Sequence, residues 1–176
     1  ILRLKLTQWF IVSICMVTGV SVAHGQTDYC RYAHLSEIDL LAQPIKYDVQ
    51  QLHKDTCSLL LITEISSMYC KSRNEDLLII LDSIAQKSDG FLSEYLVDVT
   101  SGLIKCQPDW FLLHVCKRQE CIGLWQFVSF HAANDSKESE GFKLIQQFLR
   151  RRRGKLKQYG AFKTLQSIVG KRSATS

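Results

Sequence analysis

The sequence lacks the short motifs that mark common enzyme active sites. The patterns Gly-x-Ser-x-Gly and His-Glu-x-x-His and the phosphate-binding loop are all absent, so no nucleophile elbow, zinc-protease helix or nucleotide site is predicted. The carboxylates of Asp28, Glu64, Glu75 and Asp76 have the context of a solvated surface only. We therefore predict that the chain is not an enzyme and uses no cofactor.

Clustered metal ligands are also missing from the sequence. Outside the first 25 residues, the four histidines do not pair at helical spacing: His34, His53, His114 and His131. The closest cysteines, Cys116 and Cys121, do not form a Cys-x-x-Cys pair. No metal site is predicted, because structural zinc needs its ligands grouped at short spacing.

Only one long apolar run occurs, and it lies at the start of the chain. Arg3 and Lys5 precede an almost uncharged segment, Trp9–Val22, and Ala23 and Gly25 are small residues where a signal peptidase cleaves. This pattern is typical of a secretory signal peptide over residues 1–25. We expect a soluble, extracellular domain over residues 26–170, no membrane attachment after signal removal, and a disordered tail over residues 171–176.

The cysteine content agrees with secretion. Removal of Cys15 with the signal leaves an even set of six: Cys30, Cys57, Cys70, Cys106, Cys116 and Cys121. In an oxidising compartment, six cysteines predict three disulfides. Their spacing alone leaves the pairing open.

Apolar residues recur mostly at helical spacing. A helix is predicted from Ser36, which is a good N-cap, through Leu52, with a bend at Pro44. Residues 59–65 fit either a buried helix or a strand. Ser72 and Glu75 form a capping box before the apolar run 77–84, and a further helix is predicted from Phe91 to about Cys106.

The last third of the chain predicts two more helical segments. Asp109 can cap a helix within the aromatic- and cysteine-rich residues 110–130. Residues 142–169 are compatible with one long helix, which Gly154 and Gly160 can interrupt. The fold class is therefore all-α, an extracellular helix bundle.

A basic block stands out from a chain that is otherwise close to neutral. It contains Arg150, Arg151, Arg152, Arg153, Lys155 and Lys157. One interpretation is an exposed helix face that binds anionic glycosaminoglycans rather than nucleic acid. The other is a processing site: cleavage at Arg150–Arg153 and at Lys171–Arg172 would release an amidated peptide of about residues 154–169, as from a prohormone.

One glycosylation signal is present. Asn134-Asp135-Ser136 is an Asn-x-Ser acceptor, and it lies in a polar hinge between two helical segments. Asn134 is therefore a candidate glycan site.

The cysteine order resembles that of the interleukin-seven and interleukin-nine cytokines, most closely interleukin-seven. The resemblance rests on Asp28-Tyr29-Cys30, on the twelve residues between Cys57 and Cys70, on the run NEDLLIILDSI after Cys70 and on EYLVDVTSGLIKC ending at Cys106. It covers a little over half the chain. Stem-cell-factor-like and thymic-stromal-lymphopoietin-like growth factors share the same general plan.

This resemblance implies a short-chain four-helix cytokine bundle with up-up-down-down topology. Its fourth helix would lie at 110–130 or at 142–169. The resemblance also implies three nested disulfides: Cys30–Cys121, Cys57–Cys116 and Cys70–Cys106.

The function implied is that of a monomeric growth factor. It would pair class I cytokine receptor subunits, an alpha subunit and the common gamma chain, and so support lymphocyte survival and proliferation. From helical phase, the predicted receptor-binding residues are Asp48, Gln51, Lys54, Glu94 and Asp98.

Overall fold

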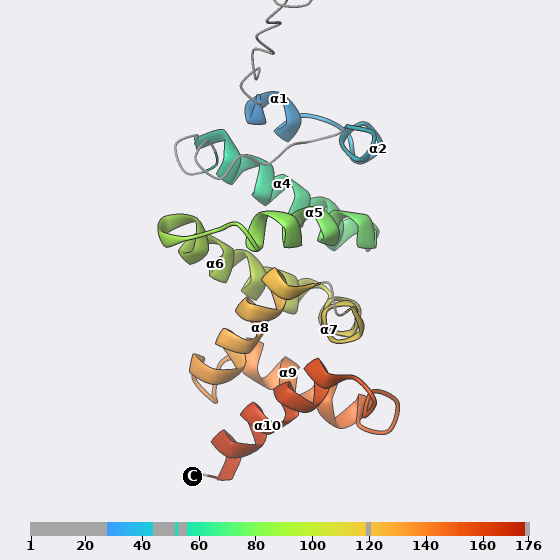
Figure 1. Ribbon diagram of the computed structural model, residues 1–176, viewed down its shortest axis with the longest axis vertical. Helices are drawn as coiled ribbons and strands as arrows, with labels where there is room; N and C mark the ends of the chain where they lie inside the picture. Colours follow the sequence, from blue (N-terminus) through green and yellow to red (C-terminus); the bar gives the residue numbers. More distant parts are fainter. Residues whose placement is uncertain (1–27, 44–51, 53–55, 119–120, 175–176) are drawn as a thin grey trace, which may run out of the picture.

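The computed structural model describes residues 28–43, 52, 56–118 and 121–174, and all regular structure in these ranges is helical. The helices are stacked along the long axis of the molecule, from α1 and α2 at one end to α9 and α10 at the other (Figure 1). Their bounds are α1 Tyr29–Ala33, α2 Glu37–Leu41, α4 Thr56–Ser72, α5 Glu75–Ala85, α6 Gly90–Cys106, α7 Pro108–Lys117, α8 Ile122–Asn134, α9 Glu140–Arg152 and α10 Gly160–Ala174. The all-α prediction is confirmed.

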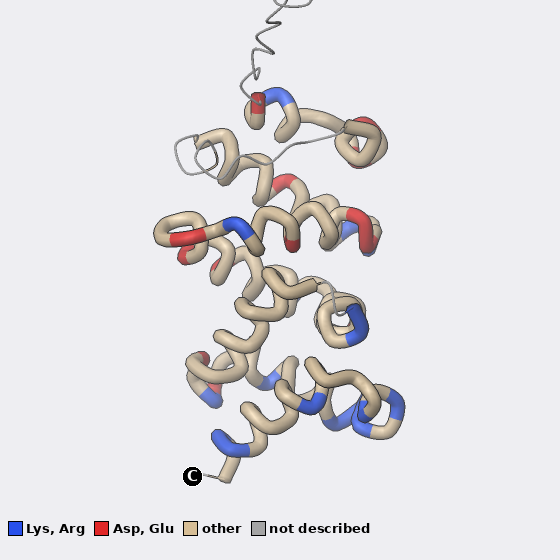
Figure 2. The backbone as a smooth tube through the Cα atoms, viewed as in Figure 1, with Lys and Arg blue, Asp and Glu red and all other residues tan. Residues whose placement is uncertain are grey.

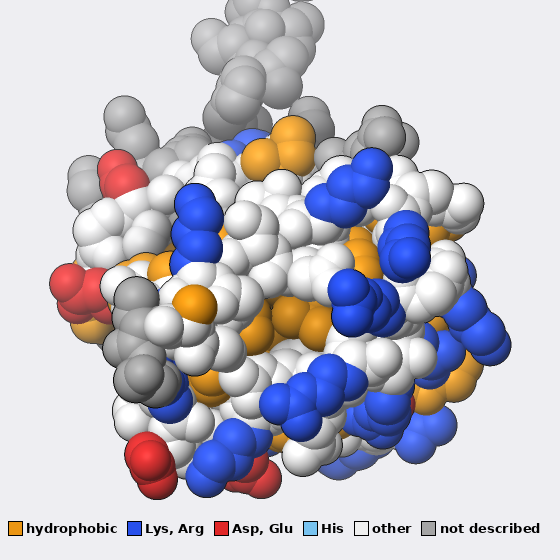
Figure 3. Space-filling model, turned by 90° about the horizontal axis from the view of Figure 1, so that it is seen from below, with side chains coloured by type: hydrophobic (Ala, Val, Ile, Leu, Met, Phe, Trp, Pro, Cys, Tyr) orange, Lys and Arg blue, Asp and Glu red, His pale blue; other side chains and the backbone are white. Residues whose placement is uncertain are grey.

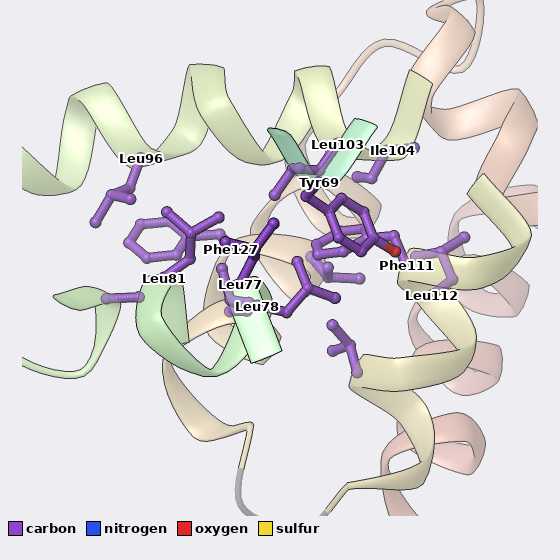
Figure 4. Close-up of a cluster of buried hydrophobic side chains, with 14 of the residues drawn as sticks. Tyr69, Leu77, Leu78, Leu81, Leu96, Leu103, Ile104, Phe111, Leu112 and Phe127 are labelled. Carbon is purple, nitrogen blue, oxygen red and sulfur yellow. The ribbon is translucent and has the colours of Figure 1, made fainter. Parts of the chain in front are cut away.

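Helix α8 lies at the centre of the packing. It contacts α5, α6, α9 and α10, and its apolar residues point in several directions, as expected of a helix that is covered on most sides. Figure 4 shows the neighbouring part of the core, where side chains from α4, α5, α6 and α7 meet Phe127 of α8. The rings of Tyr69 and Phe111 meet there edge to face, with centroids 6.5 Å apart.

A buried carboxylate fixes the start of α8. Asp82 of α5 is almost fully buried, and its Oδ1 accepts a hydrogen bond of 2.7 Å from the backbone N–H of Leu124. Its Oδ2 accepts a bond of 2.6 Å from Gln86 Nε2. Asp82, a residue of α5, therefore accepts a hydrogen bond from an N–H group in the first turn of α8. The N-cap residue of α8, Cys121, makes no side-chain capping bond of its own.

Several predicted helix ends are wrong. The capping box at Ser72 is not formed: α4 continues through Ser72, whose Oγ donates to the Met68 carbonyl. The chain then turns through Arg73, at φ 62°, and Asn74 caps α5 instead. The next prediction, a cap at Asp109, fails because α7 begins at Pro108, a residue suited to the first helical position.

The chain after residue 140 forms two helices rather than one long helix. α9 ends at Arg152, and the turn through Gly154 reverses the chain so that Leu156 and Phe162 of the following segment enter the core. α10 then continues to Ala174, so residues 171–174 are helical where a disordered tail was predicted. The cap predicted at Ser36 is confirmed, since its Oγ accepts from Asp39 N–H.

The disulfides agree only in part with the pairing that the resemblance implied. Cys70, near the end of α4, is bonded to Cys106 at the end of α6, as expected. The implied pairs Cys30–Cys121 and Cys57–Cys116 are both wrong, because Cys30 is bonded to Cys57. The described residues thus contain two disulfides and not three.

The order in which the helices pack explains why Cys30 is bonded to Cys57 and not to Cys121. Helix α1, which carries Cys30, packs against α4, which carries Cys57. Cys116 in α7 and Cys121 before α8 belong to elements that pack against α10, towards the other end of the stack. Both side chains are buried there, outside the two disulfides.

Candidate functional site

Charge is divided sharply along the chain and along the molecule. Residues 1–140 hold twelve Lys and Arg against seventeen Asp and Glu, a formal charge of −5, whereas residues 141–176 hold ten Lys and Arg and no acidic residue, a formal charge of +10. Figure 2 shows acidic residues mainly on the upper helices, with a few more at the α8–α9 connection, and basic residues on α9, α10 and the turn between them. We call the part formed by α9, the α9–α10 turn and α10 the basic end.

Three residues of the predicted arginine block, Arg150–Arg152, form the last turn of α9, and Arg153 is its C-cap. Arg150, Arg151 and Arg153 are exposed and Arg152 is half-buried, while the opposite face of α9 buries Phe148 and other apolar residues. Arg151 Nη1 lies 3.1 Å from Asp109 Oδ2 of α7, a partly exposed pair of small energetic value. The block therefore lies on an exposed helix face, one of the two interpretations made from the sequence.

A pocket opens where α7, α8 and the start of α10 meet. Its volume is about 300 Å³, and its walls come from the end of α7, the start of α8 and the first turn of α10. Arg118, Trp125 and Tyr159 are among the side chains that line it. Figure 3, which views the molecule from this end, shows hydrophobic side chains in a hollow with Lys and Arg around them.

Cys116 also lines the pocket, in surroundings that disfavour the reactive thiolate form. Burial raises the pKa of Cys116 to about 12, so the thiol stays protonated at neutral pH and the reactive thiolate is not formed. The pocket is therefore suited to binding rather than to thiol chemistry.

A buried histidine links α7 to α5 beside the pocket. His114 Nδ1 lies 3.1 Å from Glu75 Oε2, and Arg118 Nη2 lies 3.4 Å from the same oxygen. Burial lowers the pKa of His114, and the nearby Glu75 opposes this shift only in part. A neutral imidazole that bonds a carboxylate at the start of α5 joins two helices, and we assign it a structural role.

The other predicted site residues are spread over the molecule. Asp48, Gln51 and Lys54 lie outside the described residues. Glu94 and Asp98 are exposed one turn apart on α6. Asn134 is exposed as the last residue of α8, and its Nδ2 donates to the Phe130 carbonyl at 3.0 Å. The structure does not bring these groups together.

The described residues contain neither a metal site nor a membrane-spanning helix. No group of three His, Cys, Asp or Glu side chains is placed to hold a metal ion in the ranges that the structure covers. Across the same parts of the chain, no helix has the length and apolar character needed to cross a bilayer.

The pocket was missed by the sequence analysis. Trp125 and Arg118 lie close together in the sequence, within a region predicted to be helical, but Tyr159 joins them only because the chain reverses after α9. The basic block within residues 150–157 was the one signal for this end of the molecule.

Comparisons with known proteins do not extend this description. No family model, no curated protein and no solved structure matches the chain. The candidate site therefore rests on its own geometry and charge.

Proposed function

We propose that this protein is an extracellular binding protein whose basic end attaches to linear sulfated polysaccharide. The observation that carries the proposal is the segregation of charge: the last 36 residues hold ten cationic side chains and no acidic one. The two disulfides are compatible with an oxidising, extracellular location, where sulfated glycosaminoglycans are the abundant linear polyanion.

The side-chain type also favours this partner. Four consecutive arginines place guanidinium groups around the last turn of α9, and the planar guanidinium binds tetrahedral oxyanions through two parallel N–H donors. Lys155 and Lys157 continue the exposed basic surface along the turn that follows. A flexible, repeating polyanion can contact all of these groups in succession.

The test is binding to heparin at physiological salt. Replacing Arg150, Arg151, Arg152 and Arg153 by serine should weaken binding at least about tenfold and reduce its salt dependence, because fewer counterions are released on binding. Calorimetric titration at several salt concentrations measures both quantities.

A matched variant controls for net charge. Replacing the basic residues Arg31, Lys71, Lys87 and Lys105 by serine removes the same charge from the other part of the molecule, and heparin affinity should then change by less than about threefold. Equal losses in the two variants would show that only net charge matters and would contradict a localised site.

The receptor-pairing cytokine is the second candidate function. It is favoured by the Cys70–Cys106 disulfide, which the resemblance implied, and by the exposed carboxylates of Glu94 and Asp98 on α6. In this proposal the helices adopt the up-up-down-down bundle, and the monomeric protein brings an alpha subunit and the common gamma chain together without chemistry.

This candidate predicts that exchanging Glu94 and Asp98 for lysine abolishes signalling while the fold is retained. The readout is phosphorylation of signal transducers in lymphoid cells that carry the common gamma chain, with circular dichroism to verify folding. Lack of any response to the unmodified protein would reject the cytokine proposal and leave polysaccharide binding intact.

The prohormone alternative meets a packing difficulty. Leu156, Phe162, Leu165 and Val169 of the segment to be released are buried. Cleavage at Arg150–Arg153 would free this segment only if α10 left α7, α8 and α9, which it contacts. We therefore prefer a function in which the chain stays intact.

A further inference from the structure

The pocket at the basic end has walls of two kinds. Trp125 of α8 and Tyr159 before α10 provide aromatic surface, and the buried Val115 and Cys116 of α7 add apolar atoms. Among the described residues that line the pocket, Arg118 is the one cationic side chain and none is acidic. An apolar cavity with a single charged group is the usual form of a site for a small ligand, in which the charge fixes the orientation.

The charge at this pocket selects anions. The guanidinium of Arg118 is about two-fifths exposed, and its contact with Glu75 is long, 3.4 Å through one nitrogen. The first turn of α10, which lines the opposite side, contains no acidic residue. Because the surrounding basic end adds further positive charge, a cation would be repelled and an anion attracted.

The volume limits the size of the ligand. At about 300 Å³ the cavity lies at the small end of ligand pockets, so it accommodates one ring or one short chain and not a sugar polymer. Contact with the rings of Trp125 and Tyr159 favours a ligand that has an apolar part, such as an aromatic ring or an alkyl group.

We propose that this pocket binds a small amphipathic anion, a single aromatic ring or short alkyl chain that carries a sulfate or carboxylate group. The anionic group pairs with Arg118, and the apolar part lies between Trp125, Tyr159 and the wall of α7. This site is separate from the arginine block at the end of α9, since none of Arg150–Arg153 lines the pocket.

The experiment is calorimetric titration of the purified protein with octyl sulfate below its micelle concentration. One molecule should bind per chain. Arg118→Gln should weaken binding about tenfold, because a hydrogen bond to a charged group is lost. Ala161→Phe, which adds a ring to the pocket wall, should abolish binding, and Lys71→Gln, on the exposed surface of α4 and outside the pocket, should leave it unchanged within about twofold.

Three further probes separate the contribution of the ligand's charge from that of its alkyl chain and from polysaccharide binding. Octyltrimethylammonium, with the same chain and the opposite charge, should not bind, and inorganic sulfate should bind far more weakly than octyl sulfate. Equal binding of the two octyl compounds would overturn the proposal, and so would an unchanged octyl sulfate affinity in Arg118→Gln. Because Arg118→Gln changes only a partly exposed side chain, it tests the proposal even if Ala161→Phe does not fold. Heparin affinity should persist in both pocket variants, which keeps this outcome distinct from that of the polysaccharide test.

Discussion

Replacing Gly123 by alanine is expected to lower the free energy of unfolding by about 3 kcal/mol, because the added methyl group has no space. Gly123 is the second residue of α8, where that helix crosses α5. A Cβ atom at this position would lie 2.6 Å from the backbone nitrogen of Gln86 and 2.8 Å from the Asp82 carbonyl oxygen. Backbone atoms cannot rotate away as a flexible side chain can, so α8 would have to move.

That movement would affect more than one contact. The hydrogen bond from Leu124 N–H to the buried Asp82 carboxylate depends on the same close approach, and its loss would leave a buried charge poorly solvated. α8 also contacts α6, α9 and α10, so a shift away from α5 has to be accommodated on its other sides.

Gly102 provides the matched control for this substitution. It lies within α6, is exposed, and a Cβ atom there would meet nothing within 4 Å. Gly102→Ala should therefore stabilise the protein by about 1 kcal/mol through helix propensity alone. Urea unfolding followed by circular dichroism compares the two variants, and similar midpoints for both would refute the close α5–α8 contact.

Removing the Cys70–Cys106 disulfide should cost about 4 kcal/mol of stability in the chain-entropy description. The bond closes a loop with a sequence separation of 36 residues and joins the ends of α4 and α6, two helices that pack together. The variant Cys70→Ser with Cys106→Ser opens this loop in the unfolded chain and lets the two helix ends separate.

Reducing conditions give the control. With dithiothreitol present, Cys30–Cys57 is reduced in both proteins and Cys70–Cys106 in the unmodified protein, so the unfolding midpoints of the unmodified protein and the double serine variant should converge. A double variant as stable as the oxidised unmodified protein would show that this disulfide contributes little to the fold.

The sequence was sufficient for the helices whose ends are set locally. The apolar spacing from Phe91 onward predicted α6 to within one residue at its start, and the cap at Ser36 is formed by its own neighbours. It was insufficient where two local signals competed. Ser72 could end one helix or begin another. In the structure the chain leaves α4 through the left-handed residue Arg73, and Asn74 is the N-cap of α5.

In the candidate site, too, some features were visible in the sequence and others arise only from the fold. The basic block is a feature of composition and was visible in the sequence, whereas the pocket needs the reversal of the chain between α9 and α10. The cap that Asp82 supplies to α8 joins residues 42 positions apart. The pairing of Cys30 with Cys57 likewise follows from helix order in space, which cysteine spacing does not encode.

The separation of acidic and basic residues also gives the molecule an electric dipole along its long axis (Figure 2). In the field of a polyanionic surface this dipole experiences a torque that turns α9 and α10 towards the surface before contact. The range of that torque is about one Debye length, roughly 8 Å at physiological ionic strength. Encounters would therefore be orientationally biased, with an association rate that falls as salt is added, and the end that carries α1 and α2 would face away from the surface.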